Sequence, residues 1–198
     1  MKKMDFEIVI GVTGLLAAGK DVLTDRLIEL GFGVKRTSDP IRTVAADRDI
    51  AEPTREQLQD IGNWGRTQGL GFWALEAARL LSKEGHTRVA INGLRHSGEV
   101  EALRKEFGDR FVLVGIEAPT MVRFRRVAGR NRTGDSMDIE GFLKMDDRDR
   151  GIGEPWDGQR VDLAMACVQQ ENRFCNDGTL KAYHGWIQAF LDRVLVKA

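Results

Sequence analysis

Short apolar runs alternate with longer amphipathic segments along the chain. Residues 7–13 form a β-branched apolar run without alternation, which is typical of a strand buried on both faces of a parallel sheet. Apolar residues then recur at helical spacing from Val22 to Leu30, and Gly31 suits the C-terminal cap of that helix. The opening unit is therefore predicted to be strand, loop and helix.

The same alternation continues to the end of the chain. Further strands are expected at 33–37, 88–92, 111–116 and, from a weaker pattern, 173–175. Helices are expected after 38–40, twice within 53–84 with a break at 69–71, and around 100–107, 121–128, 137–150, 160–168 and 186–195. Periodicity is lost between residues 129 and 136, which predicts a loop. Strands that alternate with helices predict an α/β fold, a parallel sheet covered by helices on both faces.

A phosphate-binding pattern lies between the first strand and the first helix. Residues 14–21 read Gly-Leu-Leu-Ala-Ala-Gly-Lys-Asp and satisfy Gly-x-x-x-x-Gly-Lys. The glycines let backbone N–H groups curl around a phosphate, and the helix N-terminus and Lys20 add positive charge. We expect these residues to bind the phosphates of a nucleotide: Gly14, Leu15, Ala17, Ala18, Gly19, Lys20, Asp21 and Val22.

Two features of this loop leave alternatives open. A glycine-rich turn also occurs without a ligand, but a lysine at a helix start then costs about a few tenths of a kcal/mol against the helix dipole. Asp21 stands where Ser or Thr usually coordinates Mg²⁺. A carboxylate can hold the metal directly or through water, or it can serve only as a favourable acid in the first helical turn.

Composition limits the classes of function. The 198 residues are 42% hydrophobic, which predicts one globular domain over 1–198. Lys and Arg number 30, as do Asp and Glu, so the chain lacks the net charge that drives non-specific nucleic-acid binding. A nucleic-acid partner is therefore not expected. A membrane partner is not expected either, because no apolar run reaches about 18 residues. The sequence predicts a cytoplasmic protein.

Charged side chains near predicted strand ends are the candidates for chemistry. Ligands of parallel α/β sheets bind beyond the carboxyl ends of the strands, where Asp39 and Arg95 fall. Asp39 is interpreted as a general base or acceptor-orienting group that faces the γ-phosphate, and a helix cap before Pro40 is the alternative. With Asp39, the expected acceptor-binding residues are Arg42, Arg66 and Arg95.

Arginines also flank the aperiodic stretch. Arg126 leads into it, Arg130 and Arg132 lie within it and Arg148 follows it. We interpret residues 129–150 as a lid that closes over the nucleotide and excludes water, with an exposed helix as the alternative for Arg130, Arg132 and Arg148.

The remaining reactive side chains are expected to have structural roles. Two cysteines without a Cys-x-x-Cys pair are expected in the core: Cys167 and Cys175. Three histidines without metal-ligand spacing are expected at the surface or in turns: His86, His96 and His184. Four tryptophans are expected to pack rather than to stack on bases: Trp64, Trp73, Trp156 and Trp186.

These motifs together resemble the nucleoside monophosphate kinase branch of the P-loop proteins, and within it the dephospho-CoA-kinase-like group with related archaeal and bacterial nucleotide kinases. The resemblance covers nearly the whole chain. Its motifs are residues 14–21, 38–42, 54–59, 92–101, 118–126, 130–132, 147–149 and 176–180. The aspartate after Lys20 is also similar to the loop of phage deoxynucleoside monophosphate kinases.

The resemblance implies a three-layer P-loop kinase fold with a five-stranded parallel sheet and a small lid. It implies ATP and Mg²⁺ as cofactors and transfer of phosphate to a nucleotide-like hydroxyl or phosphate. Lys20 would hold the β- and γ-phosphates, Arg126 and Arg130 would reach them from the lid, and Asn176 to Gly178 would lie beside the adenine. Asn92 departs from the pattern, because relatives commonly carry Asp at the end of this strand.

Two functions are compatible with these residues. The first is a small-molecule kinase whose catalytic residues are Lys20, Asp39, Arg95 and Arg130, and whose acceptor is a nucleoside monophosphate or a molecule such as dephospho-CoA. The alternative is a nucleotide-binding switch or slow NTPase that signals to a partner protein. The acceptor-side residues favour the kinase, since a switch does not need them.

Overall fold

The structure, a computed structural model, describes residues 4–130, 138–153 and 158–196. Its centre is a five-stranded sheet with the strand order β2-β3-β1-β4-β5, and every pairing is parallel. The strands are β1 (Ile8–Thr13), β2 (Gly33–Arg36), β3 (Arg88–Leu94), β4 (Phe111–Glu117) and β5 (Arg173–Cys175). The predicted parallel α/β sheet is confirmed, including its short fifth strand.

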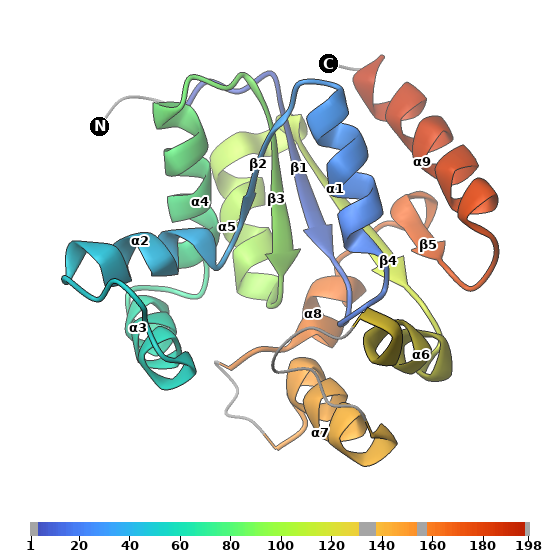
Figure 1. Ribbon diagram of the computed structural model, residues 1–198. Helices are drawn as coiled ribbons and strands as arrows, with labels where there is room; N and C mark the ends of the chain where they lie inside the picture. Colours follow the sequence, from blue (N-terminus) through green and yellow to red (C-terminus); the bar gives the residue numbers. More distant parts are fainter. Residues whose placement is uncertain (1–3, 131–137, 154–157, 197–198) are drawn as a thin grey trace.

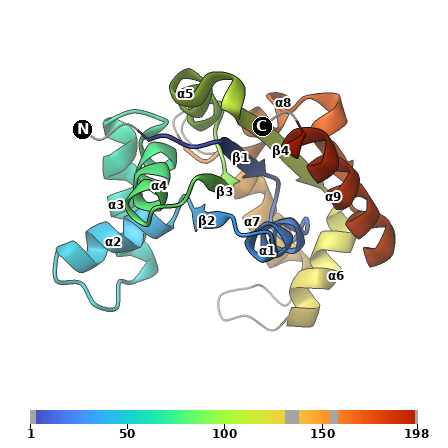
Figure 2. The same ribbon diagram turned by 90° about the horizontal axis from the view of Figure 1, so that it is seen from above.

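Helices cover both faces of the sheet (Figures 1 and 2). On one face, α4 (Phe72–Lys83), α5 (Ser97–Phe107) and α8 (Val161–Ala166) bury apolar side chains against β1, β3 and β4. On the other face, α1 (Lys20–Glu29) and α9 (Leu180–Leu195) form a second apolar cluster. The two clusters explain why the strand residues are apolar without alternation.

The other helices surround the edge at which the strands end (Figure 1). They are α2 (Asp39–Asp47), α3 (Arg55–Thr67), α6 (Thr120–Arg130) and α7 (Ile139–Arg150). Helices α2 and α3 pack on Trp73 of α4 in a small apolar cluster. Short 3₁₀ turns precede β4 and β5, at Gly108–Arg110 and Gln170–Asn172. No helix within the described parts of the chain is both long and apolar enough to cross a membrane.

The predicted helix and strand positions are confirmed within a few residues, with differences near residues 39 and 130. Asp39 is the first residue of α2 and Ser38 precedes it as the cap residue, so Asp39 is not the helix cap. Gly129 and Arg130 complete α6 rather than opening a loop. The rest of the predicted loop lies outside the described residues, as do Arg132 and Trp156.

One expectation about burial is wrong. Cys175 is exposed and Cys167 is only partly buried, because β5 is a sheet edge and α8 is short. His96 lies in the turn between β3 and α5, one of the two positions expected for it, and is 8% exposed. Its Nδ1 accepts the Gly98 N–H at 3.0 Å, so the imidazole caps α5 in the manner of a side-chain oxygen.

A buried ion pair joins α6 to α7. The guanidinium of Arg123 is fully buried, and its two terminal nitrogens lie 2.5 and 2.8 Å from the carboxylate oxygens of Asp146. Arg150 donates to the same carboxylate at 3.2 Å. Burial alone would raise the pKa of Asp146, but the hydrogen bonds and charges of Arg123 and Arg150 outweigh it and hold the pKa below 3.8.

We expect Asp146→Asn to destabilise the protein by about 3–5 kcal/mol, because Arg123 then stays buried without a counter-charge. The free energy of unfolding in urea measures this. The contribution is present above about pH 4 and is lost as the pH falls through the lowered pKa, so the variant should lack this acid-dependent step. Asp147→Asn, at the exposed next position, is the control. Equal stability of the two variants would contradict the assignment.

Candidate functional site

The loop between β1 and α1 passes very close to neighbouring backbone. Gly14 has φ +143°, and a Cβ there would collide with the carbonyl oxygen of Ile116 in β4. Gly19 has φ +109°, and a Cβ there would collide with the side chain of Asn176. Both positions therefore require glycine for backbone conformation and for space.

Side chains bind every carbonyl oxygen from residue 14 to residue 19. Nζ of Lys20 donates to Gly14 at 2.6 Å and to Leu15 at 2.9 Å. The other donors come from α6, α9 and the segment after β5: Arg123 to Leu16 at 3.4 Å, Arg126 to Ala17 and Ala18 at 3.3 and 3.2 Å, Asn176 to Ala18 at 2.9 Å, and Tyr183 to Gly19 at 3.0 Å. No side chain caps the N-terminus of α1. With its carbonyls engaged, the loop can offer its N–H groups to an anion.

The ammonium of Lys20 is electrostatically strained. Burial, together with the nearby cation of Arg95, lowers its pKa from 10.5 to about 8, although Asp149 and Asp21 partly offset both effects. A phosphate beside this ammonium would restore the missing counter-charge. Lys20 is therefore suited to bind an anion.

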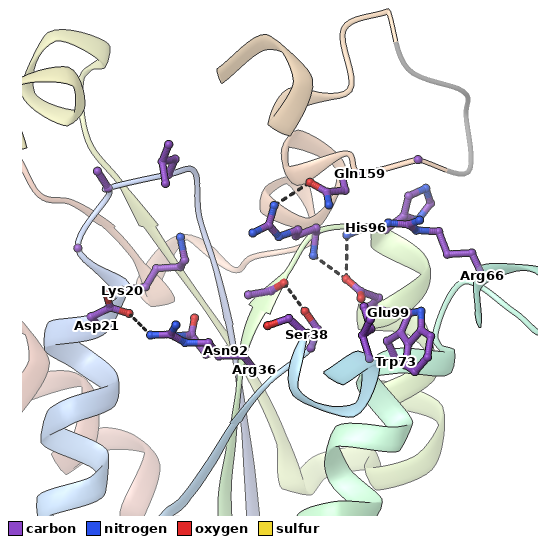
Figure 3. Close-up of a pocket in the computed structure, with 18 of the residues that line it drawn as sticks. Lys20, Asp21, Arg36, Ser38, Arg66, Trp73, Asn92, His96, Glu99 and Gln159 are labelled. Atoms are coloured by element: carbon purple, nitrogen blue, oxygen red, sulfur yellow. Dashed lines mark hydrogen bonds and ion pairs between the residues drawn. The ribbon is translucent and has the colours of Figure 1, made fainter. Parts of the chain in front are cut away.

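A cavity of about 500 Å³ opens at the carboxyl edge of the sheet (Figure 3). Lys20 and Asp21 lie at one end, and Arg66, Trp73 and Glu99 lie at the other. Among the described residues, its wall carries two carboxylates, Asp21 and Glu99, and five cationic side chains: Lys20, Arg36, Arg66, Arg95 and Arg126. Cationic groups therefore outnumber acidic ones in the described part of the wall, which favours an anionic ligand.

Arg95 connects the cavity to α7. Its Nη1 lies 3.0 Å from a carboxylate oxygen of Asp149 and 2.7 Å from the side-chain oxygen of Gln159. Asp149 and Asp146 are three residues apart on α7, so one helix supplies the carboxylates for both Arg95 and Arg123.

Two residues that line the cavity have side-chain oxygens of the kind that serve as magnesium ligands. Asn92, at the end of β3, is 4% exposed, and its Oδ1 has no hydrogen-bond partner within the described residues. Asp21 has a half-exposed carboxylate, 3.3 Å from Arg36. The described residues contain no cluster of three or more His, Cys, Asp or Glu that would hold a metal. Mg²⁺ beside a nucleotide commonly needs only one or two protein oxygens, with phosphate and water completing the shell.

The structure brings many of the predicted site residues into the cavity wall. They are Ala17, Gly19, Lys20, Asp21, Arg66, Arg95 and Arg126. Gly14, Leu15, Ala18 and Val22 belong to the same loop and first helical turn. Asn176 is buried behind the loop rather than in the cavity, and Gly178 is exposed nearby.

Two predicted acceptor residues do not line the cavity. The Asp39 carboxylate turns back and accepts the Arg36 N–H at 2.7 Å, and Arg42 is exposed. The Arg130 backbone ends α6, but its side chain lies outside the described part of the chain. The roles of these three residues remain predictions.

Sequence reasoning missed Glu99, Arg123 and Tyr183. Arg123 and Tyr183 reach the phosphate-binding loop across more than 100 residues of sequence, so local pattern contains no signal for them. Glu99 had one signal: it stands three residues after the cap residue of α5, where a glutamate completes a capping box.

Comparison with known proteins assigns the family. No protein-family model matches the chain. A UPF0200 protein of Methanosarcina mazei is 31% identical over 192 residues, which cover 96% of this chain and 98% of that protein. The chain belongs to the UPF0200 family.

Solved structures place this UPF0200 chain among proteins with the fold of small-molecule P-loop kinases. A shikimate kinase from Bacteroides thetaiotaomicron aligns with a TM-score of 0.52 at 15% identity, covering 96% of this chain and 99% of the other. A gluconokinase from Sinorhizobium meliloti aligns with a TM-score of 0.51 at 15% identity, covering 96% and 94%. The predicted P-loop kinase fold is confirmed, whereas a specific likeness to dephospho-CoA kinase is not shown.

We expect ATP to bind more weakly as the pH rises above 8, by about tenfold per pH unit, because the ligand-free protein then loses the Lys20 proton. Isothermal titration without metal between pH 7 and 9.5 measures this. The Lys20→Met variant should bind weakly at every pH and show no such slope. Wild-type affinity that stays constant to pH 9.5 would contradict the role of the ammonium.

Proposed function

We propose that this UPF0200 chain is an ATP-dependent phosphotransferase, which moves the γ-phosphate of ATP to a nucleoside monophosphate or a nucleotide-like acceptor such as dephospho-CoA. The observation that carries the proposal is the two-ended cavity. One end is the phosphate-binding loop with Lys20, and the other contains a separate cation, Arg66. A second anionic molecule can therefore lie in line with the nucleotide.

Each end of the cavity has a distinct task. The loop N–H groups and Lys20 bind the β- and γ-phosphates of ATP. Arg95, which also lines the cavity, neutralises charge on the transferring group, while Arg66 holds the acceptor. Arg126 and Asn176 support the loop by binding its carbonyl oxygens.

Asp21 and Asn92 would hold the magnesium ion that accompanies ATP. When bound, the metal would neutralise phosphate charge and align the β- and γ-phosphates. The orphaned Oδ1 of Asn92 supports this assignment, since a buried amide oxygen without a partner is costly unless a ligand completes it.

The transfer balances without an additional reactant. An acceptor oxygen bonds to the γ-phosphorus, the bond to the β–γ bridging oxygen breaks, and ADP leaves with the electron pair. A phosphate oxygen of a nucleoside monophosphate carries no proton at neutral pH, whereas a hydroxyl acceptor releases one to a base or to water.

Lys20→Ala should lower phosphate transfer by about 100- to 1,000-fold, because the principal cation on the transferring phosphate is lost. The assay follows ADP formation with Mg²⁺ and a panel of ribo- and deoxynucleoside monophosphates and dephospho-CoA. Thermal unfolding should stay close to wild type, since the substitution also removes a strained charge.

Lys105→Ala is the matched control, because Lys105 is exposed near the C-terminus of α5, at the opposite edge of the sheet. It should retain wild-type turnover. Turnover that persists in Lys20→Ala would refute the kinase. ATP binding without stimulation by any acceptor would instead support the alternative of a nucleotide-binding switch or slow NTPase.

A further inference from the structure

Glu99 is a buried carboxylate in the wall of the cavity. It lies in the first turn of α5 and is 8% exposed. Figure 3 shows it at the end of the cavity opposite Lys20, near Trp73 and His96. A carboxylate is costly to bury, so its position beside an open cavity requires an explanation.

One oxygen of Glu99 is fully engaged by the protein. Oε2 accepts the backbone N–H of Arg95 at 2.6 Å and that of His96 at 3.1 Å. Together with the His96 imidazole, which accepts from Gly98, these bonds form a capping box at the start of α5. The carboxylate is therefore fixed in orientation.

The other oxygen is available to a ligand. The hydrogen bonds of Glu99 to described residues all end on Oε2, which leaves Oε1 at the cavity. The surrounding wall is mixed: Arg66 from α3 and Arg95 supply cations, and Ile41 and Trp73 supply apolar surface. A fixed acceptor atom between cations and apolar surface suits a ligand that has an anionic group and a hydrogen-bond donor.

We propose that Glu99 determines acceptor specificity: Oε1 accepts a hydrogen bond from an amine, ring N–H or hydroxyl of the acceptor, while Arg66 and Arg95 bind the acceptor's anionic group. The inference rests on the proposed phosphotransferase function and defines the acceptor as an anion that also carries a donor. Glu99 lies opposite the phosphate-binding loop, so it selects the acceptor and takes no part in the transfer.

The charge state of Glu99 supports this role. Burial raises its pKa from 4.5 to about 7, against the backbone N–H groups and the cations of Arg95 and Arg66, which lower it. A donor from the acceptor stabilises the ionised form. Acceptor binding should therefore strengthen by about tenfold between pH 6 and pH 8 through this group.

The Glu99→Gln variant separates ligand recognition from helix capping. Glutamine also serves in a capping box, so its oxygen can keep the bonds to Arg95 and His96. Its NH₂ group then faces the cavity, where a hydrogen-bond acceptor is replaced by a donor. The substitution thus preserves the fold and presents the ligand with a hydrogen-bond donor in place of an acceptor.

With the nucleoside monophosphates and dephospho-CoA as probes, Glu99→Gln should raise the acceptor KM by about 10- to 100-fold. The values of kcat and of KM for ATP should stay within threefold. Glu101→Gln, an exposed change on the same helix, should leave all three constants unchanged. A purely structural role would predict no selective change in the acceptor KM.

A pH series gives an independent readout. The phosphate of the acceptor, whose second ionisation lies near pH 6, and the His96 side chain are the same in both experiments. The difference in acceptor KM between wild type and Glu99→Gln therefore reports the contribution of the glutamate alone. That difference should grow as the pH rises from 6 to 8. A difference that does not change over this range would overturn the inference.

The failures are distinguishable. If the wild type transfers phosphate and Glu99→Gln does so with an unchanged acceptor KM, the specificity role is wrong and the phosphotransferase stands. If the wild type binds ATP but transfers to no acceptor in the panel, or binds no ATP, the proposed function fails and this inference fails with it.

Discussion

The whole site depends on how the carbonyl groups of residues 14–19 are bound. A backbone loop can present its N–H groups to an anion only when its carbonyl oxygens point elsewhere and have partners there. Lys20, Arg126, Asn176 and Tyr183 supply most of those partners. The last two belong to the segment after β5 and to α9, so the end of the chain determines the conformation of a loop near its beginning.

That constraint explains the packing of the C-terminal region. Phe174 of β5 stacks on Tyr183 with ring centroids 4.9 Å apart, and Trp186 stacks on Phe190 at 5.4 Å. The aromatic column holds α9 on the sheet and positions the Tyr183 hydroxyl 3.0 Å from the Gly19 carbonyl. Burial raises the pKa of Tyr183, so the hydroxyl stays a donor at any physiological pH.

The sequence was sufficient to predict the order of strands and helices along the chain, but not the contacts that complete the site. The phosphate-binding loop was predictable because glycine, small residues and lysine occur together in one local segment after a strand. Arg123 was noted only as part of a motif, since nothing local shows that its guanidinium reaches both Asp146 and the loop. The turn position of His96 is predictable, whereas its burial depends on packing beside Glu99. Cys175 is expected in the core but is exposed, because its strand β5 is at the edge of the sheet.

The most direct test is a crystal structure with Mg²⁺ and a non-hydrolysable ATP analogue. We expect Nζ of Lys20 to leave the carbonyl oxygens of Gly14 and Leu15 for the β- and γ-phosphates, and the γ-phosphate to point towards Arg95. The bonds from Arg126, Asn176 and Tyr183 to the loop should remain. A triphosphate bound elsewhere, with Lys20 still on the two carbonyls, would show that this loop is not the phosphate-binding site.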